Sequence, residues 1–221
     1  MNILITGANR GLGLEFVNQY KMSSNNRIFA CCRNPQQLQI EEENVTVHKL
    51  DVTSLDNMKE LKSEIANTPI DLLIHNAGVY GSKNSFGNVD VDSWLNTLKI
   101  NTIAPLKLSE ILVDNVAASQ KKMIAIITSK MGSISDNTSG GSYVYRTSKS
   151  AVNMVGVSMS RDLKPQGITV LLLHPGWVET DMGGSNALLK PKESVEGMCK
   201  VIETTTDSGA FFAYDGQKIN W

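Results

Sequence analysis

The chain has 221 residues, of which 41% are hydrophobic and 19% are charged, and its formal net charge at pH 7 is -1. This composition is typical of a soluble globular protein, and the length suits one sizeable hydrophobic core. Because the charges nearly balance and the longest basic run is only Lys121-Lys122, we expect neither nucleic acid nor a membrane surface as a partner.

Short runs of β-branched residues alternate with helical patterns along the whole chain. Strands are predicted at Ile3–Thr6, Ile28–Cys32, Val45–Leu50, Asp71–His75, Met123–Thr128, Ile168–His174 and Ala210–Ala213. Helices are predicted at about Leu12–Met22, Leu55–Ala66, Val91–Ala118, Tyr143–Leu163 and Pro191–Thr205. This alternation predicts an α/β fold with a single doubly wound, Rossmann-type domain over residues 1–221. Its sheet should be seven-stranded and mainly parallel, with helices on both faces.

The cysteines and the N-terminal residues indicate the cellular compartment of the protein. Cys31 and Cys32 are adjacent and Cys199 stands alone, so they match neither a disulfide framework nor a metal-binding spacing. We therefore expect no metal site. The first strand reaches a glycine loop at Gly7, which leaves no room for a signal peptide, and no apolar stretch approaches the roughly 20 residues of a membrane helix. A cytoplasmic protein is predicted.

A glycine loop follows the first predicted strand, at the edge of the sheet where doubly wound folds bind ligands. Glycines there let the backbone approach a phosphate, and the next helix offers free N–H groups. The spacing Gly-x-x-x-Gly-x-Gly differs from the regular dinucleotide fingerprint, so a tight turn without a ligand stays an alternative. We favour cofactor binding, and the candidate contacts in this loop are Gly7, Asn9, Arg10, Gly11, Leu12 and Gly13.

The end of the second strand indicates which dinucleotide binds. An NAD site usually has a carboxylate here that holds the ribose 2′-hydroxyl. This chain has Arg33 instead and no acid until Glu41, and Arg10 lies in the glycine loop. Two guanidinium groups suit a 2′-phosphate, although both could be ordinary surface cations. The sequence therefore favours NADP(H) over NAD(H).

The stretch Tyr143-Val144-Tyr145-Arg146-Thr147-Ser148-Lys149 carries the candidate chemistry. Tyr145 and Lys149 are four residues apart and share a face on a helix, whereas Tyr143 has only Thr147 at that spacing. A nearby ammonium would lower the tyrosine pKa from its usual value near 10. Ser129, which follows the fifth strand, could donate a hydrogen bond to a substrate oxygen, or could simply satisfy the strand end.

The separate segments together resemble the short-chain dehydrogenase/reductase superfamily across nearly the whole chain. The matching segments are Thr6–Gly13, Asp51-Val52, Asn76-Ala77-Gly78, Asn101, Ser129, Tyr145 with Lys149, and Pro175-Gly176 with Thr180. Within the superfamily the chain is most similar to the sniffer and C-factor branch of carbonyl reductases. The segments Tyr145–Ser150, His174–Gly184 and the ending Tyr214-Asp215-Gly216 to Trp221 carry that narrower resemblance.

The resemblance implies catalytic roles. Tyr145 would be the proton donor in reduction, and Lys149 would lower its pKa and hold the nicotinamide ribose. Ser129 would orient the carbonyl, and Asn101 would help to hold a water molecule that relays protons to Lys149. Although many members of the family have another asparagine at the position of His75, a histidine there is better explained by packing, with its ring bonded to nearby backbone.

The resemblance also implies the cofactor contacts. Asp51 would bind the adenine amino group, with Val52 packed beside the adenine, and Thr180 would meet the carboxamide. The remaining contacts would come from Asn76, Ala77, Gly78, Pro175, Gly176 and Val178. The cofactor site would then lie mainly in residues 1–120, and the catalytic and substrate elements mainly in residues 121–221.

The leading hypothesis is an NADPH-dependent reductase of aldehydes, ketones or quinones. The short segment between Thr180 and Pro191 predicts an open cleft, whose apolar wall could include Met131, Ile134, Trp177 and Met182 unless these side chains simply pack under loops. The main alternative is an NADP(H)-binding signalling or redox-sensing protein of the C-factor type with little turnover. A sugar-nucleotide epimerase would need a substrate domain after the sheet, which we do not expect in this sequence.

A homodimer is the predicted assembly, since members of the superfamily often pair through the two long helices. Here these helices lie around residues 101–118 and 143–163, and Val152, Val155 and Met159 could serve either the dimer or the core.

Overall fold

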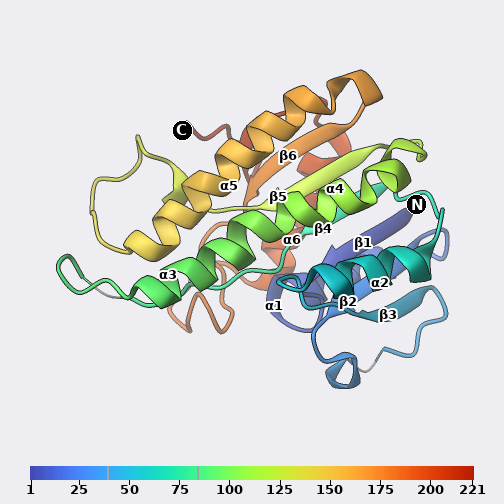
Figure 1. Cartoon of the computed structure of the whole chain (residues 1–221), viewed down its shortest axis with the longest axis horizontal. Helices are drawn as coiled ribbons and strands as arrows, with labels where there is room; N and C mark the ends of the chain where they lie inside the picture. The colour runs from blue at the N-terminus through green and yellow to red at the C-terminus, as the bar shows by residue number, and fades with distance from the viewer. Residues whose placement is uncertain (39, 84) are drawn as a thin grey trace.

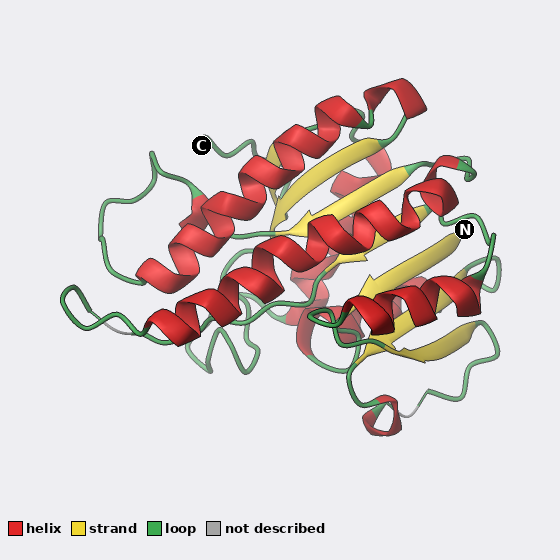
Figure 2. Cartoon of the chain, viewed as in Figure 1, coloured by secondary structure: helices red, strands yellow, loops and turns green. Residues whose placement is uncertain are grey.

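The computed structural model describes residues 1–38, 40–83 and 85–221. These residues form one seven-stranded sheet with the strand order β3-β2-β1-β4-β5-β6-β7, and every neighbouring pair is parallel (Figures 1 and 2). The strands are β1 (Asn2–Thr6), β2 (Arg27–Cys32), β3 (Val45–Lys49), β4 (Leu72–His75), β5 (Met123–Ile127), β6 (Thr169–His174) and β7 (Phe211–Ala213). The predicted doubly wound fold is confirmed, and the sheet is parallel throughout.

Helices cover both faces of the sheet. They are α1 (Gly11–Tyr20), α2 (Leu55–Ile65), α3 (Val91–Leu98), α4 (Ala104–Ala117), α5 (Tyr143–Asp162) and α6 (Pro191–Thr204), with short 3₁₀ turns η1 (Pro35–Gln37), η3 (Lys130–Gly132) and η4 (Lys164–Gln166). In Figure 1, α2, α4 and α5 lie in front of the sheet, and α1 and α6 lie behind it. Among the described helices, none is long and apolar enough to cross a membrane.

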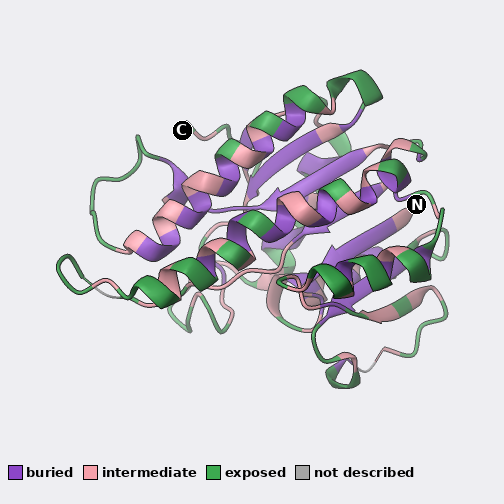
Figure 3. Ribbon diagram, in the orientation of Figure 1, coloured by how far each residue is buried: buried purple, intermediate pink, exposed green. Residues whose placement is uncertain are grey.

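The hydrophobic core is two layers, one on each face of the sheet (Figure 3). Strand side chains alternate between them, because successive residues of a strand point to opposite faces. In β5, Met123, Ala125 and Ile127 join the layer under α1 and α6, while Ile124 and Ile126 join the layer under α2, α4 and α5. The apolar run in this strand is therefore explained by burial on both faces.

The prediction of one continuous helix over Val91–Ala118 is wrong at its centre. A π-helical turn, η2 (Lys99–Ile103), separates α3 from α4. Pro105 has no N–H group that could bond to the carbonyl of Asn101, so the regular α-helical ladder cannot continue through this point. Single π turns occur frequently at functional sites, and this one contains Asn101.

Candidate active site

The strand order reverses between β1 and β4, since β1 leads to α1 on one face and β4 leads to α3 and α4 on the other. In doubly wound folds ligands bind at such a point, beyond the carboxyl ends of the strands. A cleft of about 1020 Å³ lies there. It is lined by residues that follow β1, β2, β3, β4 and β6 and by the first turns of α1 and α5.

Hydrogen bonds between the ends of β1 and β4 hold the glycine loop in place. Thr6 Oγ1 accepts bonds from the backbone N–H groups of Asn76 and Ala77, both at 3.1 Å. Asn76 Nδ2 donates to the carbonyl oxygens of Thr6 at 2.9 Å and Gly7 at 3.1 Å. Gly7 has φ +66°, which favours glycine, and a Cβ on Gly13 would lie 2.1 Å from the Gly7 carbonyl oxygen. The loop and α1 therefore pack without room for side chains.

The N-terminus of α1 faces the cleft. Its N-cap residue is Arg10, whose side chain makes no capping bond. Gly11 and Leu12 form the first turn and line the cleft beside Asn9. Free N–H groups and the positive end of the helix dipole make this position suited to a phosphate group.

Two arginines line the part of the cleft after β1 and β2. Arg33 directly follows β2, and Arg10 Nη1 donates to Asp181 Oδ2 at 2.7 Å. Both partners of that ion pair are strongly exposed, so it is easily exchanged for another anion. Asp51, after β3, accepts bonds from the N–H and the hydroxyl of Thr53 at 2.9 and 2.7 Å. These bonds, with a smaller contribution from Arg33, lower the pKa of Asp51.

Tyr145 and Lys149 lie one turn apart on α5, and both line the cleft. Tyr145 is 8% exposed and Lys149 is 5% exposed. Lys149 Nζ donates to the carbonyl oxygen of Ile127 at 2.9 Å and lies 5.7 Å from the centroid of the Tyr145 ring. Burial lowers the pKa of Lys149 to about 8. Burial also raises the pKa of Tyr145 to about 12, while a hydrogen bond with Ser129 acts in the opposite direction.

Asn101 is buried beside this pair, in the π turn. Its Oδ1 accepts from the N–H of Val79 at 2.9 Å, and its Nδ2 donates to the Val79 carbonyl oxygen at 2.8 Å and to Ser148 Oγ at 3.0 Å. A Cβ on Gly78 would lie 3.3 Å from Asn101 Oδ1 and 3.7 Å from Lys149 Nζ. Asn101 thus ties the segment after β4 to α5, and Gly78 leaves the space between them open.

Most of the predicted site residues come together at the cleft. Those that line it are Gly7, Asn9, Arg10, Gly11, Leu12, Arg33, Asp51, Val52, Asn76, Ala77, Gly78, Tyr145, Lys149, Pro175 and Thr180. Five others are not among its lining residues, namely Gly13, Asn101, Ser129, Gly176 and Val178. Val178 is buried and pairs with Leu189, and Gly176, at φ +82°, packs against Tyr214. Their individual roles stay predictions.

The histidine at the end of β4 is buried, as expected for a packing residue, but its partner is not backbone. His75 Nε2 lies 2.8 Å from Ser109 Oγ on α4. Burial lowers the pKa of His75 to about 3, so the ring is neutral at physiological pH.

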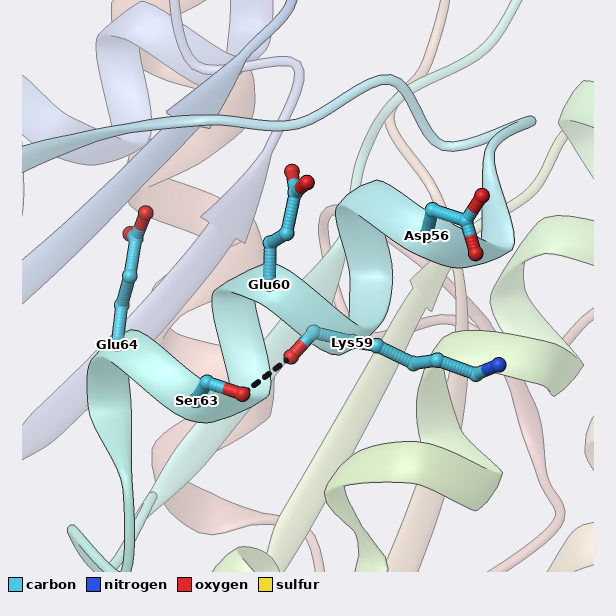
Figure 4. Close-up of a pocket in the computed structure, with 5 residues that line it drawn as sticks. All are labelled: Asp56, Lys59, Glu60, Ser63 and Glu64. Atoms are coloured by element: carbon cyan, nitrogen blue, oxygen red, sulfur yellow. Dashed lines mark hydrogen bonds between the residues drawn. The ribbon is translucent and has the colours of Figure 1, made fainter.

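A second hollow, on the exposed side of α2, is shallow and about 470 Å³ in volume (Figure 4). In Figure 4 the Glu60 and Glu64 side chains extend to the same side of α2, and Asp56 lies apart from them. Ser63 Oγ donates to the Lys59 carbonyl oxygen one turn back. In the described ranges, no group of histidine, cysteine or acidic side chains could hold a metal ion. This surface is a solvated helix face.

The sequence model of the short chain dehydrogenase family matches residues 1–188. The chain belongs to this family. It is 42% identical to C-signal of Myxococcus xanthus over 166 residues, which are 74% of this chain and all of that protein. It is 34% identical to 1-hydroxy-2-glutathionyl-2-methyl-3-butene dehydrogenase of Rhodococcus sp. (strain AD45), with 99% of each chain covered.

Solved structures of carbonyl reductases are similar to this dehydrogenase over its whole length. The NADPH-bound carbonyl reductase from chicken fatty liver is 33% identical, with a TM-score of 0.91 over 100% of this chain and 98% of that one. The carbonyl reductase Sniffer of D. melanogaster is also 33% identical, with a TM-score of 0.92 over 100% of this chain and 99% of that one. The chain is therefore an oxidoreductase of the short-chain family. It is similar in sequence to C-signal and in structure to the carbonyl reductases.

Several cleft residues of this dehydrogenase were not found from the sequence. They include Leu14, Glu15, Asn18, Thr53, Asn96, Ile100, Thr128, Glu179 and Asp181. Asp181 could have been found, because an acid directly follows Thr180 and the opposite loop carries Arg10. Asn96 and Ile100 gave no signal, because Asn96 lies on α3 and Ile100 lies in the π turn that follows it, and no local pattern predicts that turn.

Replacement of Asn101 by alanine should destabilise the protein. The change leaves both backbone groups of Val79 without their partner, and unpaired buried polar groups cost about 1 to 3 kcal/mol each. We expect the free energy of unfolding in urea to fall by about 2 kcal/mol or more. Asn96→Ala, on the exposed face of α3, is the matched control and should change stability by less than about 0.5 kcal/mol. Equal losses in the two variants would contradict this role.

Proposed function

We propose that the protein is an NADPH-dependent reductase that converts an aldehyde, ketone or quinone to an alcohol, with Tyr145 as the proton donor. The observation that carries the proposal is the buried pair of Tyr145 and Lys149 at the wall of the cleft. Ser129 is near enough to lower the pKa of the same tyrosine. The likeness to carbonyl reductases, including one solved with NADPH, supports it. We expect it to act in the cytoplasm, where its free cysteines would stay reduced.

The residues at the cleft fit a dinucleotide. The N-terminus of α1 has no side-chain cap in the described part of the chain, and it faces the cleft as a phosphate site would. Gly78 leaves the wall open beside Lys149, where a side chain would fill the space. We expect the cofactor contacts mainly from residues 1–120 and the chemistry from residues 121–221, within one domain.

In the proposed reaction, bound NADPH supplies the hydride. The raised pKa of Tyr145 keeps its hydroxyl protonated at neutral pH, so it can donate a proton to the carbonyl oxygen as negative charge develops. The Ser129 hydroxyl donates a hydrogen bond to the same oxygen. Lys149, when charged, stabilises the phenolate that Tyr145 becomes. Asn101 holds the segment of Gly78 and Val79 against α5 and so fixes the position of Lys149 relative to this segment.

Tyr145→Phe should nearly abolish carbonyl reduction, because it removes the acid and leaves the ring. The loss in kcat should be about a hundredfold or more, with NADPH affinity close to that of the wild type. Tyr143→Phe is the matched control and should keep most activity, since Tyr143 lies on α5 with no lysine one turn later. NADPH absorbance with a panel of carbonyl compounds measures both. If Tyr143→Phe lost its activity while Tyr145→Phe kept it, the assignment of Tyr145 as the proton donor would be contradicted.

The cofactor preference rests on Arg33 and Arg10, which both line the cleft. A 2′-phosphate would bond to Arg33, and would take Arg10 from its exposed pairing with Asp181. The family also includes NAD-dependent enzymes, whose carboxylate at the end of β2 is replaced here by arginine. These charges favour NADPH over NADH.

Arg33→Asp should reverse that preference. Charge-assisted hydrogen bonds are worth roughly ten- to hundredfold in affinity each, so the wild type should bind NADPH more tightly by at least about tenfold. Arg10→Ala should weaken NADPH and leave NADH nearly unchanged. The preference should shrink as salt is added, because the arginines are exposed. Fluorescence titration of both cofactors measures these effects, and equal or tighter NADH binding by the wild type would contradict the assignment.

Of the four residues predicted for an apolar wall, Met182 lines the cleft, and Met131 lies in the turn after Ser129. Ile134 and Trp177 are exposed but are not among the lining residues. We therefore expect Met182 to contact a substrate, and the apolar wall as a whole stays a prediction.

One alternative is supported by a specific observation. The identity of 42% with C-signal favours an NADP(H)-binding signalling or redox-sensing protein with little turnover. Ser129, Tyr145 and Lys149 argue against it, because a sensor would not need an acid with this buried environment. Bound NADPH without turnover on any carbonyl compound would favour the sensor.

We further propose a homodimer. Val152 and Met159 belong to the core, but Met154 on the other side of α5 is 67% exposed. Val91, Leu95 and Ile103 on α3 and the π turn are also exposed. Apolar surface of this kind on long helices suits association with a second copy.

Met154→Asp should convert the dimer to a monomer, because a charge would be buried at the interface. Met22→Asp is the control, since Met22 is 81% exposed after the end of α1. Size-exclusion chromatography with light scattering measures the mass. A monomeric wild type, or a dimer that survives Met154→Asp, would contradict this interface.

A further inference from the structure

A second tyrosine covers the proposed catalytic tyrosine. Tyr80 lies two residues after Gly78, in the segment between β4 and α3. Its ring stacks on that of Tyr145 with a centroid distance of 4.4 Å and an interplanar angle of 12°. Tyr80 is only partly buried, whereas Tyr145 beneath it is almost fully buried. The stacked ring therefore accounts for part of the burial of Tyr145.

The hydroxyl group of Tyr80 is anchored to both neighbouring parts of the site. It lies 3.0 Å from Ser142 Oγ, directly before α5, and 3.9 Å from Met131 Sδ, in the turn after Ser129. The stack is thus connected to the helix that carries Tyr145 and to the segment that carries Ser129.

The backbone on either side of Tyr80 is also fixed. Asn101 bonds to both the N–H and the carbonyl of Val79, and the N–H of Ser82 donates to Ser93 Oγ at 2.9 Å. Gly81 has φ +73°, and a Cβ there would lie 2.5 Å from Thr97 Oγ1 and 2.6 Å from a methyl carbon of Val144. This segment is packed against α3 and α5, so the Tyr80 ring is held where it lies.

We propose that Tyr80 is a positioning residue for the proposed reduction, which fixes the ring of Tyr145 and shields its face from water. The χ2 angle of a tyrosine side chain has a broad distribution, so a ring without a stacking partner samples a range of tilts. Rate depends steeply on how well the reacting groups are aligned. The inference rests on the proposed function, because it takes Tyr145 as the proton donor.

Shielding also affects protonation. The groups that face Tyr145 are Lys149 on its own helix, Ser129 after β5 and Tyr80 after β4. Lys83 Nζ lies 5.3 Å from the centroid of the Tyr80 ring and adds a cation on that side. Burial raises the pKa of Tyr145, and the contact with Tyr80 acts in the same direction. Loss of the Tyr80 ring should therefore lower the pKa of Tyr145, since water reaches the hydroxyl and Lys149 remains.

Tyr80→Leu tests the role with two readouts. We expect kcat for carbonyl reduction to fall by about tenfold or more, with NADPH affinity unchanged. A proton donor must be protonated, so the alkaline limb of the kcat profile should move to lower pH. Tyrosinate absorbance of the protein without added cofactor, with Tyr145→Phe as the reference, should show Tyr145 titrating at lower pH in Tyr80→Leu than in the wild type.

Tyr80→Phe keeps the stack and should restore most of kcat and the wild-type titration. Tyr143→Leu removes another ring of the same helix turn and should change neither readout. Circular dichroism checks folding, and Tyr80→Gln replaces Tyr80→Leu if the leucine variant does not fold. An active wild type whose Tyr80→Leu and Tyr80→Gln variants keep its kcat and titration would overturn the positioning role alone. A wild type that binds NADPH but reduces no carbonyl would overturn the proposed function together with this role.

Discussion

A lysine ammonium buried between β5 and α5 is the constraint on which the site depends. A buried charge is costly unless acceptors surround it, and among the described residues Lys149 Nζ has one, the carbonyl of Ile127. Lys149 also lines the cleft, so its remaining donors are left for a bound molecule. Glycines make this placement possible, because a Cβ on Gly132 would lie 2.8 Å from the Lys149 backbone carbonyl carbon, and Gly78 leaves space beside Nζ. The site is therefore built around a cation that is only partly satisfied by the protein.

The end of β4 joins the two halves of the site. On one side, Asn76 and Thr6 lock the glycine loop to β4 through reciprocal hydrogen bonds. On the other side, Asn101 locks the next residues of the same segment to α5. The glycine loop and the start of α5 are thus positioned by one short stretch of backbone. A small shift of that stretch would displace both the glycine loop and α5. The side-chain hydrogen bonds of Thr6, Asn76 and Asn101 prevent such a shift.

The sheet and the glycine loop could be predicted because their signals are local. Apolar β-branched runs mark strands such as β5, and glycine spacing marks the turn after β1. The Tyr145 and Lys149 pair was found through its helical spacing. The break at Asn101 was missed, because a π turn depends on Pro105 and on a distant partner, Val79. The Tyr80 stack and the pairing of Arg10 with Asp181 were missed for the same reason, since each joins segments far apart in sequence.

The account rests on the claim that this dehydrogenase moves a hydride and does not merely bind the cofactor. The most direct measurement uses NADPH that carries deuterium at the transferable position, with a panel of aldehydes and ketones, whose alcohol products keep the label on carbon. Mass spectrometry of the products locates the label. The account predicts an alcohol with deuterium on the former carbonyl carbon, formed by the wild type and not by Tyr145→Phe. NADPH that binds yet transfers no deuterium to any member of the panel would contradict it.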